Sequence, residues 1–489
     1  MTRRLAPLVG LVALGAVLRF GTLDARSYWL DEVDTVGLLQ EGFVGMLSRL
    51  AEPGGGGPVY FFVAWPWAQV FGSSEVALRS LSALFGTATV PVAYWATREL
   101  ASRRAGVIAA ALAATAPLLV WQSQEVRPYA LLVLLGGVSF ALFLRARRAP
   151  DGGAPAAWAV ASVLLVATNY VAAFMVAVEA LLLLREHAER RVRIAVLAAG
   201  AATAALIPLV LEGREGGLAQ LPDESGILRR LLVLPAEFLA GPQPPLQVLT
   251  PVVAGLIALV AVLLIIRRAD RAEQGAAGLA AGIGAASILL AAVFSLSGSD
   301  LVLTRYLSEV WIPAAAVASV GFATAGASRW GPVAAGALCA LFAVIVVATA
   351  WEPKFDREDW RGAARAVGTA SAKRAIVVSP GRGPAAFAYY RPQARAMTPS
   401  GGEVSEIVYV AFPSSVQGIG RKPQSPPAEA VAAAPAGFTV VEQERHEFFT
   451  LARLRSERPV RVTIEGLAAA VPGSEPAFFL EPVRAEVRP

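Results

Sequence analysis

Charged residues, cysteine and histidine are all scarce in this sequence. Only 16% of its 489 residues are charged whereas 56% are hydrophobic, and this balance excludes an ordinary soluble globular protein. The single cysteine, Cys339, lies inside an apolar run, so the chain has no disulfide framework. The only two histidines, His187 and His446, leave no zinc-type ligand spacing. A compact scaffold held together by disulfides or zinc is therefore excluded.

What the sequence has in abundance is apolar runs of roughly 17–25 residues, long enough to cross a bilayer. Because only helices and closed barrels satisfy the backbone within lipid, these runs predict a polytopic α-helical membrane protein. The first run has a basic start, as a signal peptide does, but we expect an uncleaved helix because many runs follow. We expect eleven transmembrane helices, near residues 5–23, 77–97, 105–121, 128–145, 156–168, 171–184, 194–211, 246–266, 276–296, 306–326 and 331–351.

Arginine clusters between these runs predict the orientation of the chain. All of them fall on one side of the map, and the positive-inside rule makes that side, together with the N-terminus, cytoplasmic. The sequence pI of about 9.7 follows from these clusters and requires no nucleic-acid partner. The clusters contain Arg3, Arg4, Arg98, Arg103, Arg104, Arg145, Arg147, Arg148, Arg185, Arg190, Arg191, Arg193, Arg267, Arg268, Arg271 and Arg329. The loops that contain residues 27–35, 123–128, 212–245 and 297–306 then face outward.

The first outward loop, residues 24–76, is expected to hold two short helices lying on the membrane. Residues 58–72, PVYFFVAWPWAQVFG, are apolar but short, and a full crossing there would invert every later arginine cluster. Residues 36–50 have an amphipathic pattern. The intervening EPGGGGP, residues 52–58, lacks the lysine of a phosphate-binding loop, so we interpret it as a flexible hinge.

After Trp351 the chain becomes richer in proline and charge, which indicates a second domain. Residues 357–370 have the pattern of an amphipathic helix. Runs typical of strands occur at residues 374–379, 406–412, 438–443 and 459–466. We therefore expect a transmembrane domain, residues 1–351, followed by a small extracytoplasmic α/β domain, residues 352–489.

A dense acidic stretch, SYWLDEVDT, lies in the first outward loop. Asp31 and Glu32 are expected at the membrane–water boundary, where partial desolvation makes a carboxylate a stronger base. Such a group could take a proton from an acceptor hydroxyl, and the alternative is a solvated acidic loop. Asp34 is expected to N-cap a helix that begins near Thr35.

The second outward loop, WQSQEVRPYA, carries further candidates. Pro128 suits the first turn of a helix, so Gln124, Glu125 and Arg127 precede a helix start and Tyr129 follows it. Arg127 could bind phosphate, and Glu125 could position a sugar hydroxyl or hold Arg127. The alternative is an ordinary polar loop.

The late segment SDLVLTRYLSEVWIP places Arg305 and Tyr306 where the chain re-enters lipid. Arginine is suited to phosphate binding because its guanidinium forms a fork of donors. The alternative is an interfacial arginine whose stem lies along apolar surface. Arg229 and Arg230 are a similar but weaker case.

Glu179 and Asn169 fall in or between expected spans. Charged groups in lipid are costly and are often functional, but Glu179 could instead join helices structurally. A tight hairpin at Asn169–Tyr170 is expected, because arginine clusters flank both ends of residues 156–184 and an even number of crossings is needed.

The ordered set of motifs resembles a known family. An acidic pair after the first helix is followed by PVYFF, EVALRSLSALFGTATVPVAYWATREL, ASRRAGVIAAALAATAPLLVWQSQEVRPYAL and a late TRY. The sequence resembles the GT-C glycosyltransferases of the protein mannosyltransferase and aminoarabinose transferase type, strongly over residues 5–145. The resemblance is weaker at residues 306–313 and at REDWRGAARAV.

This resemblance implies an inverting transfer of a sugar, a hexose or a pentose, from a polyprenyl-phosphate carrier to an acceptor on the outer membrane face. The acceptor would be a cell-envelope glycan, a lipid or a protein. Asp31 matches the base of the family and Glu32 is its neighbour. The resemblance implies no cofactor, and a divalent metal is not expected. The substrate-binding residues are expected to be Tyr60, Gln124, Glu125, Arg127, Tyr129, Arg305 and Tyr306.

One departure concerns the substrate. Relatives often have His or Lys before the PVYFF-like segment, where this chain has Gly56–Gly57. Arg127, Arg305 or the pair Arg229/Arg230 could take that role. The Ala/Arg/Gly-rich composition is typical of a GC-rich bacterial genome, so we expect a multi-pass protein of a bacterial plasma membrane. The alternative functions are a flippase for the lipid-linked sugar and an inactive scaffold that binds the lipid carrier.

Overall fold

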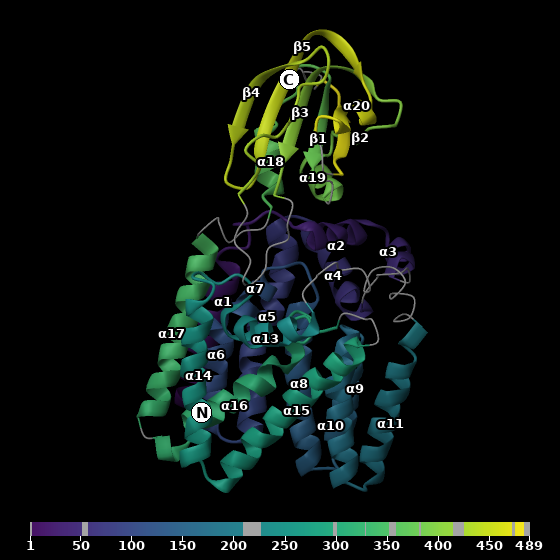
Figure 1. Cartoon of the computed structure of the whole chain (residues 1–489). Helices are drawn as coiled ribbons and strands as arrows, with labels where there is room; N and C mark the ends of the chain where they lie inside the picture. The colour runs from purple at the N-terminus through teal and green to yellow at the C-terminus, as the bar shows by residue number, and fades with distance from the viewer. Residues whose placement is uncertain are drawn as a thin grey trace. The chain divides into compact units, whose positions relative to one another are not determined.

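The computed structural model describes residues 2–50, 57–208, 226–296, 301–327, 329–351, 358–380, 383–413, 425–471 and 475–483 (Figure 1). The chain divides into two compact units: Met1–Leu23 with Leu38–Trp351, and Asp24–Gly37 with Glu352–Pro489. From the sequence we expected residues 24–37 in the membrane domain, whereas here they group with the C-terminal part. Residues 52–56 of the expected hinge, the start of the 212–245 segment and residues 297–300 lie outside the described residues.

The first unit is built from helices in the part of the chain that the structure describes. One helix, α2 (Leu30–Gln40), is shared between the units, because it begins in the second and ends in the first. The others are α1 (Thr2–Phe20), α3 (Phe43–Leu50), α4 (Pro58–Phe71), α5 (Glu75–Leu100), α6 (Arg103–Thr115), α7 (Pro117–Ser123), α8 (Tyr129–Arg148), α9 (Ala154–Val166), η1 (Tyr170–Ala172), α10 (Ala173–Glu186), α11 (Arg190–Ala204), α13 (Ile227–Ala240), α14 (Leu249–Arg268), α15 (Arg271–Ser295), η3 (Ser308–Val310), α16 (Trp311–Ala323), η4 (Ala325–Ala327) and α17 (Trp330–Trp351).

Among the described helices, α5, α8, α14, α15 and α17 are long and apolar enough to cross a membrane. A sixth span results if α6 and α7, which are bent by 55° at their junction, count as one. Three further helical stretches are apolar but shorter: Ala6–Phe20, Ala154–Val166 and Ser308–Ala323. A helical chain with several candidate membrane spans is confirmed, while the number of eleven spans and the orientation stay predictions.

The expected single span at residues 105–121 is broken in the structure, and Pro117 explains the break. Proline has no N–H, so the carbonyl of Ala113 loses its usual donor four residues later. Arg19 of α1, which is fully buried, supplies donors instead. Its Nη2 lies 2.9 Å from the oxygen of Ala113, its Nη1 lies 3.0 Å from that of Ala114, and its Nε lies 3.1 Å from Ser123 Oγ. The arginine thereby joins α1 to both sides of the α6–α7 break.

The chain also turns where a hairpin is expected, between α9 and α10. Asn169 Oδ1 accepts the N–H of Val171 at 3.0 Å and so caps η1. One carboxylate oxygen of buried Glu179 accepts hydrogen bonds from Trp158 Nε1 and Ser139 Oγ, both at 2.8 Å. Of the two alternatives left open by the sequence, these contacts favour the structural one, because Glu179 joins α8, α9 and α10.

The expected amphipathic helix at residues 36–50 is divided into α2 and α3. The division falls at Glu41 and Gly42, and α4 packs beside it. Trp65 Nε1 donates to the carbonyl of Glu41 at 3.0 Å, and Gln69 Nε2 donates to that of Leu39 at 3.4 Å. The two short helices expected in the first loop are therefore three in the structure.

The second unit contains a mixed six-stranded sheet with the order β2-β6-β1-β3-β5-β4 (Figure 1). Strands β1 and β3 are parallel, and the other neighbours are antiparallel. The elements are α18 (Trp360–Ala366), β1 (Arg374–Ser379), α19 (Pro384–Tyr390), β2 (Arg395–Ala396), β3 (Gly402–Ala411), β4 (Thr439–Arg445), β5 (Thr450–Val462), α20 (Ile464–Ala468) and β6 (Ala477–Glu481). The α/β character expected for this part of the chain is confirmed.

Two boundaries in this unit differ from the sequence expectation. The strand expected at 459–466 ends at Val462, because Thr463 Oγ1 accepts the N–H of Gly466 and starts α20. The helix expected at 357–370 is limited to α18, which Asp359 caps by accepting the N–H of Gly362 at 2.8 Å. Side-chain caps therefore set both boundaries.

Candidate active site

The acidic stretch begins helix α2, and its start lies earlier than we expected. The carbonyl of Trp29 accepts the N–H groups of Glu32 and Val33, each at 3.0 Å. The Glu32 carboxylate reaches back and accepts the N–H of Trp29 at 3.3 Å, as the third helical residue does in a capping box. The expectation that Asp34 caps a helix starting near Thr35 is therefore wrong, because Glu32 supplies this contact and Asp34 lies inside the helix.

The two candidate acids have different surroundings in this first turn. Glu32 is 1% exposed and its carboxylate is directed to the backbone of its own helix start. Asp31 is half-buried and keeps its backbone carbonyl bonded to Thr35 Oγ1 at 2.9 Å. Asp31 is thus the acid of the pair whose side chain is more accessible.

The loop between α7 and α8 is fixed by two of the residues expected to bind substrate. Gln124 Nε2 donates to Thr22 Oγ1 at 2.8 Å and to the carbonyls of Arg19 and Leu18 at 3.1 and 3.2 Å. Buried Glu125 accepts a hydrogen bond from Trp121 Nε1 at 2.8 Å. The Gln124 contacts tie the loop to the end of α1, and the Glu125 contact joins the loop to α7. The roles of both residues in substrate binding stay predictions.

Four of the residues expected to bind substrate come together from two loops far apart in the sequence. The rings of Tyr129 and Tyr306 lie 6.5 Å apart between centroids, at an angle of 47°. The guanidinium of Arg127 lies 5.7 Å from the Tyr129 ring, with Nη2 3.5 Å from its hydroxyl, and that of Arg305 lies 5.2 Å from the Tyr306 ring. We call Arg127, Tyr129, Arg305 and Tyr306 the arginine–tyrosine cluster. Two fixed cations beside two hydroxyl groups form an environment suited to an anion.

Sequence reasoning did not identify Glu237, which lies on α13 beside this cluster. Thr304 donates a hydrogen bond to its Oε2. Burial raises the pKa of Glu237, while the Thr304 hydrogen bond and the nearby charge of Arg305 act in the opposite direction. The only signal in the sequence is an isolated acid in the apolar second half of residues 227–240. The expected alternatives Arg229 and Arg230 lie on the same helix, two turns before Glu237.

Gly57, before the PVYFF segment, lies directly against the backbone of another segment. A Cβ atom at Gly57 would lie 2.3 Å from the carbonyl oxygen of Thr168 and 2.6 Å from that of Ala167. The first turn of α4 is hydrogen-bonded to the same backbone segment, because the N–H of Val59 donates to the carbonyl of Ala167 at 3.3 Å. No side chain fits at this position. Tyr60, one turn later on α4, is fully buried.

Within the described ranges, no group of three or more His, Cys, Asp or Glu side chains could hold a metal ion. The helical unit brings together the arginine–tyrosine cluster, with Glu237 beside it. The structure leaves the roles of Asp31 and Glu32 relative to this cluster as predictions, since they belong to the other unit.

The candidate membrane spans and the site define a polytopic membrane protein with paired arginines at the meeting point of two loops. Residues 53–211 match the family model of the dolichyl-phosphate-mannose-protein mannosyltransferases. For this part of the chain, the match confirms the resemblance to GT-C membrane glycosyltransferases. No curated protein sequence matches the chain significantly.

Solved structures with similarity to the chain have low sequence identity. ArnT from Cupriavidus metallidurans in the apo state is 18% identical over 66% of this chain and 61% of its own, with a TM-score of 0.46. ArnT bound to undecaprenyl phosphate is 17% identical over 67% and 62%, also at 0.46. The Archaeoglobus fulgidus oligosaccharyltransferase is 15% identical over 73% and 54%, at 0.45. The chain therefore spans about three fifths of the ArnT chains that it matches.

Proposed function

We propose that the protein is an inverting glycosyltransferase that moves a sugar from a polyprenyl-phosphate-linked donor to an acceptor hydroxyl outside the cytoplasm. The observation that carries this proposal is the arginine–tyrosine cluster, in which Arg127 and Arg305 converge from two loops. Arg127 lies in the part of the chain that matches the mannosyltransferase family. ArnT, a protein of similar fold, has been solved with undecaprenyl phosphate bound.

The chemistry then divides between two groups of residues. The acceptor oxygen attacks the anomeric carbon on the face opposite the phosphate, which inverts the configuration. The bond from that carbon to the phosphate oxygen breaks, and its electron pair stays on the departing phosphate. Arg127 and Arg305 would stabilise the growing negative charge, while Asp31 would take the proton of the acceptor hydroxyl. Glu32 supports Asp31 by fixing the start of α2.

The fixed positions of these residues also suggest what holds the donor phosphate. The glycine at position 57 cannot carry the basic side chain of relatives. Arg127 and Arg305 take that role in this proposal, and the hydroxyls of Tyr129 and Tyr306 add donors. Glu237 would keep the Arg305 side chain in place when no phosphate is bound.

The test measures transfer by the purified protein in phospholipid vesicles. Mass spectrometry of co-purifying lipids first identifies the sugar, and polyprenyl-phosphate mannose labelled in the sugar is the starting probe. Asp31→Asn is expected to lower kcat at least about 100-fold, the range typical of a lost general base. Asp34→Asn, an exposed acid one turn later on the same helix, is the matched control and is expected to keep wild-type turnover.

The arginines are tested in the same assay. Arg127→Lys and Arg305→Lys keep the charge but lose the fork of donors, so both are expected to weaken donor binding and turnover. A protein that moves the labelled lipid across the vesicle without cleaving it would be a flippase. One that binds the lipid and leaves it unchanged would be a scaffold, and either result would contradict the proposal.

A further inference from the structure

The segment that carries Asp31 is bonded to the C-terminal unit rather than standing as a free loop. The N–H of Tyr28 donates to the hydroxyl of Tyr390 at 2.6 Å. Ser27 Oγ donates to the carbonyl of Glu358 at 3.0 Å, and Arg361 Nη2 donates to the carbonyl of Asp24 at 2.9 Å. Three residues before Asp31 are therefore hydrogen-bonded to residues more than 300 positions later in the sequence.

Packing of side chains reinforces these hydrogen bonds. Tyr28 is fully buried, and its ring meets the Tyr389 ring edge-on at 5.3 Å and 72°. Leu30, the first residue of α2, reaches Gly383 so closely that a Cβ there would lie 2.8 Å from its Cδ2. The same Cβ would lie 2.4 Å from Cζ2 of Trp360 on α18. The first turn of α2 thus packs against α18 and the start of α19.

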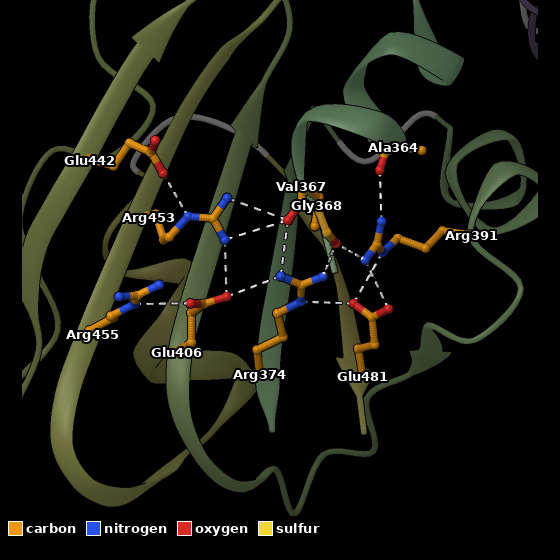
Figure 2. Close-up of polar contacts among 10 residues, drawn as sticks. All are labelled: Ala364, Val367, Gly368, Arg374, Arg391, Glu406, Glu442, Arg453, Arg455 and Glu481. Atoms are coloured by element: carbon orange, nitrogen blue, oxygen red, sulfur yellow. Dashed lines mark hydrogen bonds and ion pairs between the residues drawn. The ribbon is translucent and has the colours of Figure 1, made fainter. Parts of the chain in front are cut away.

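The two short helices that hold this segment are themselves fixed by a buried ion network (Figure 2). Arg374 donates to the carbonyl of Val367 at 3.0 Å and to that of Gly368 at 2.6 Å, both just after α18. Arg391, just after α19, donates to the carbonyl of Ala364 at 2.7 Å and also to that of Gly368. Cations suit the carbonyl end of a helix, which carries the negative end of the helix dipole.

Two carboxylates neutralise these arginines inside the sheet. Glu481 of β6 lies 2.8 Å from Arg374 Nε and 3.0 Å from Arg391 Nη2. Glu406 of β3 lies 3.0 Å from Arg374 Nη1 and, as Figure 2 shows, also contacts Arg453 and Arg455. Arg374, Glu406 and Glu481 are all at most 2% exposed. The sheet therefore fixes α18 and α19 through buried charges, and these helices hold the segment before Asp31.

We infer that the C-terminal unit positions the proposed base, with Tyr390 and Arg361 acting as positioning residues for Asp31. This inference rests on the proposed function. The backbone at Tyr28 determines where the first turn of α2 begins and hence the direction of the Asp31 carboxylate. Small displacements of a catalytic group cost large factors in rate, so this anchoring belongs to catalysis and not only to folding.

The decisive variants are Tyr390→Phe and Arg361→Ala. Tyr390→Phe keeps the ring and removes only the hydroxyl that accepts the Tyr28 N–H. Both variants are expected to lower kcat about 10- to 100-fold at unchanged donor KM, because the donor phosphate is held elsewhere. Hydrogen–deuterium exchange in residues 24–37 is expected to become faster in the same variants.

Two further variants separate positioning from general damage. Arg361→Lys, which can still donate to Asp24, is expected to recover much of the turnover. Arg365→Ala removes an exposed arginine one turn later on α18 and is expected to leave both readouts unchanged. A melting temperature within about 2 °C of wild type in Tyr390→Phe excludes loss of the fold as the cause.

The outcomes separate this inference from the function on which it rests. If wild type transfers sugar and Asp31→Asn does not, while Tyr390→Phe and Arg361→Ala keep wild-type kcat, the inference is overturned and the proposed function stands. Faster hydrogen–deuterium exchange in residues 24–37 of these two variants, with kcat unchanged, would also overturn the inference. If the wild-type protein transfers no sugar from the co-purifying lipid, the proposed function fails and the positioning role falls with it.

Discussion

At the scale of single residues, the position before α4 shows how the backbone of a neighbouring segment limits which side chain a position can carry. The family resemblance leads one to expect a basic residue near this position, but Gly57 runs directly against the backbone of Ala167 and Thr168. A backbone neighbour cannot move aside as a side chain can. In the proposed function, Arg127 and Arg305 of the same unit supply the basic groups for the donor phosphate instead.

This close approach predicts that Gly57 tolerates no substitution. Gly57→Ala is expected to lower the free energy of unfolding by about 1–3 kcal/mol, the usual cost of overpacking, because the new Cβ overlaps two carbonyl groups. Thermal unfolding in detergent measures the effect. Gly200→Ala, on α11 where a Cβ meets nothing within 4 Å, is the control and is expected to be neutral or slightly stabilising. Equal melting temperatures for both variants would refute the explanation.

At the scale of elements, the break between α6 and α7 depends on a partner from another helix. Pro117 removes one backbone donor, and buried Arg19 replaces it with contacts to Ala113, Ala114 and Ser123. A buried arginine in an apolar helix would otherwise be costly. The break directs the chain into the loop that carries Arg127, so α1 helps to hold this loop through hydrogen bonds as well as packing.

Replacement of Arg19 tests this account of the break. Arg19→Met keeps much of the volume but leaves the carbonyl of Ala113 without a donor, so a loss of about 1–3 kcal/mol of stability is expected. Arg98→Met, which removes an exposed arginine from α5, should unfold with wild-type behaviour. Chemical denaturation in detergent micelles compares the two, and a smaller effect for Arg19→Met than for Arg98→Met would contradict the account.

At the scale of the whole molecule, the C-terminal unit owes its order to buried charges as well as to its apolar core. Burial alone would raise the pKa of Glu481, but hydrogen bonds from Arg391 and Arg374 outweigh it and hold the pKa below its ordinary value. An unfolded glutamate has a pKa of about 4.3. The stabilisation from Glu481 is therefore fully present above that value and is lost as the pH falls through the lower, folded pKa.

Acidification is thus expected to destabilise this unit below about pH 4. The wild-type melting temperature, followed from pH 7 to pH 3, should fall more steeply at the acid end than that of Glu481→Gln, which has no carboxylate to protonate. Glu429→Gln, an exposed position in the same unit, should keep the wild-type profile. Parallel curves for wild type and Glu481→Gln would show that this carboxylate does not govern acid stability.

Much of the architecture could be predicted from the sequence because its causes are local. Long apolar runs indicate membrane helices, and the short apolar runs rich in Val and Ile at residues 374–379 and 406–412 indicate strands. Local capping was predicted less well: Glu32, not Asp34, sets the start of α2, because the side chain that reaches the free N–H depends on the backbone path. Arg127 and Arg305 were identified singly, but nothing in their spacing indicated that their tyrosine neighbours would meet.

The sequence by itself determined the class of the protein: a polytopic helical membrane part followed by an α/β part, with acids and arginines concentrated in particular loops. Only the tertiary structure decided three further points: that Tyr129 faces Tyr306, that Glu237 lies beside Arg305, and that the segment before Asp31 is bonded to the C-terminal unit. The physical reason is the same in each case. Hydrophobic pattern acts within one element, whereas these contacts join segments whose distance in sequence leaves no local signal.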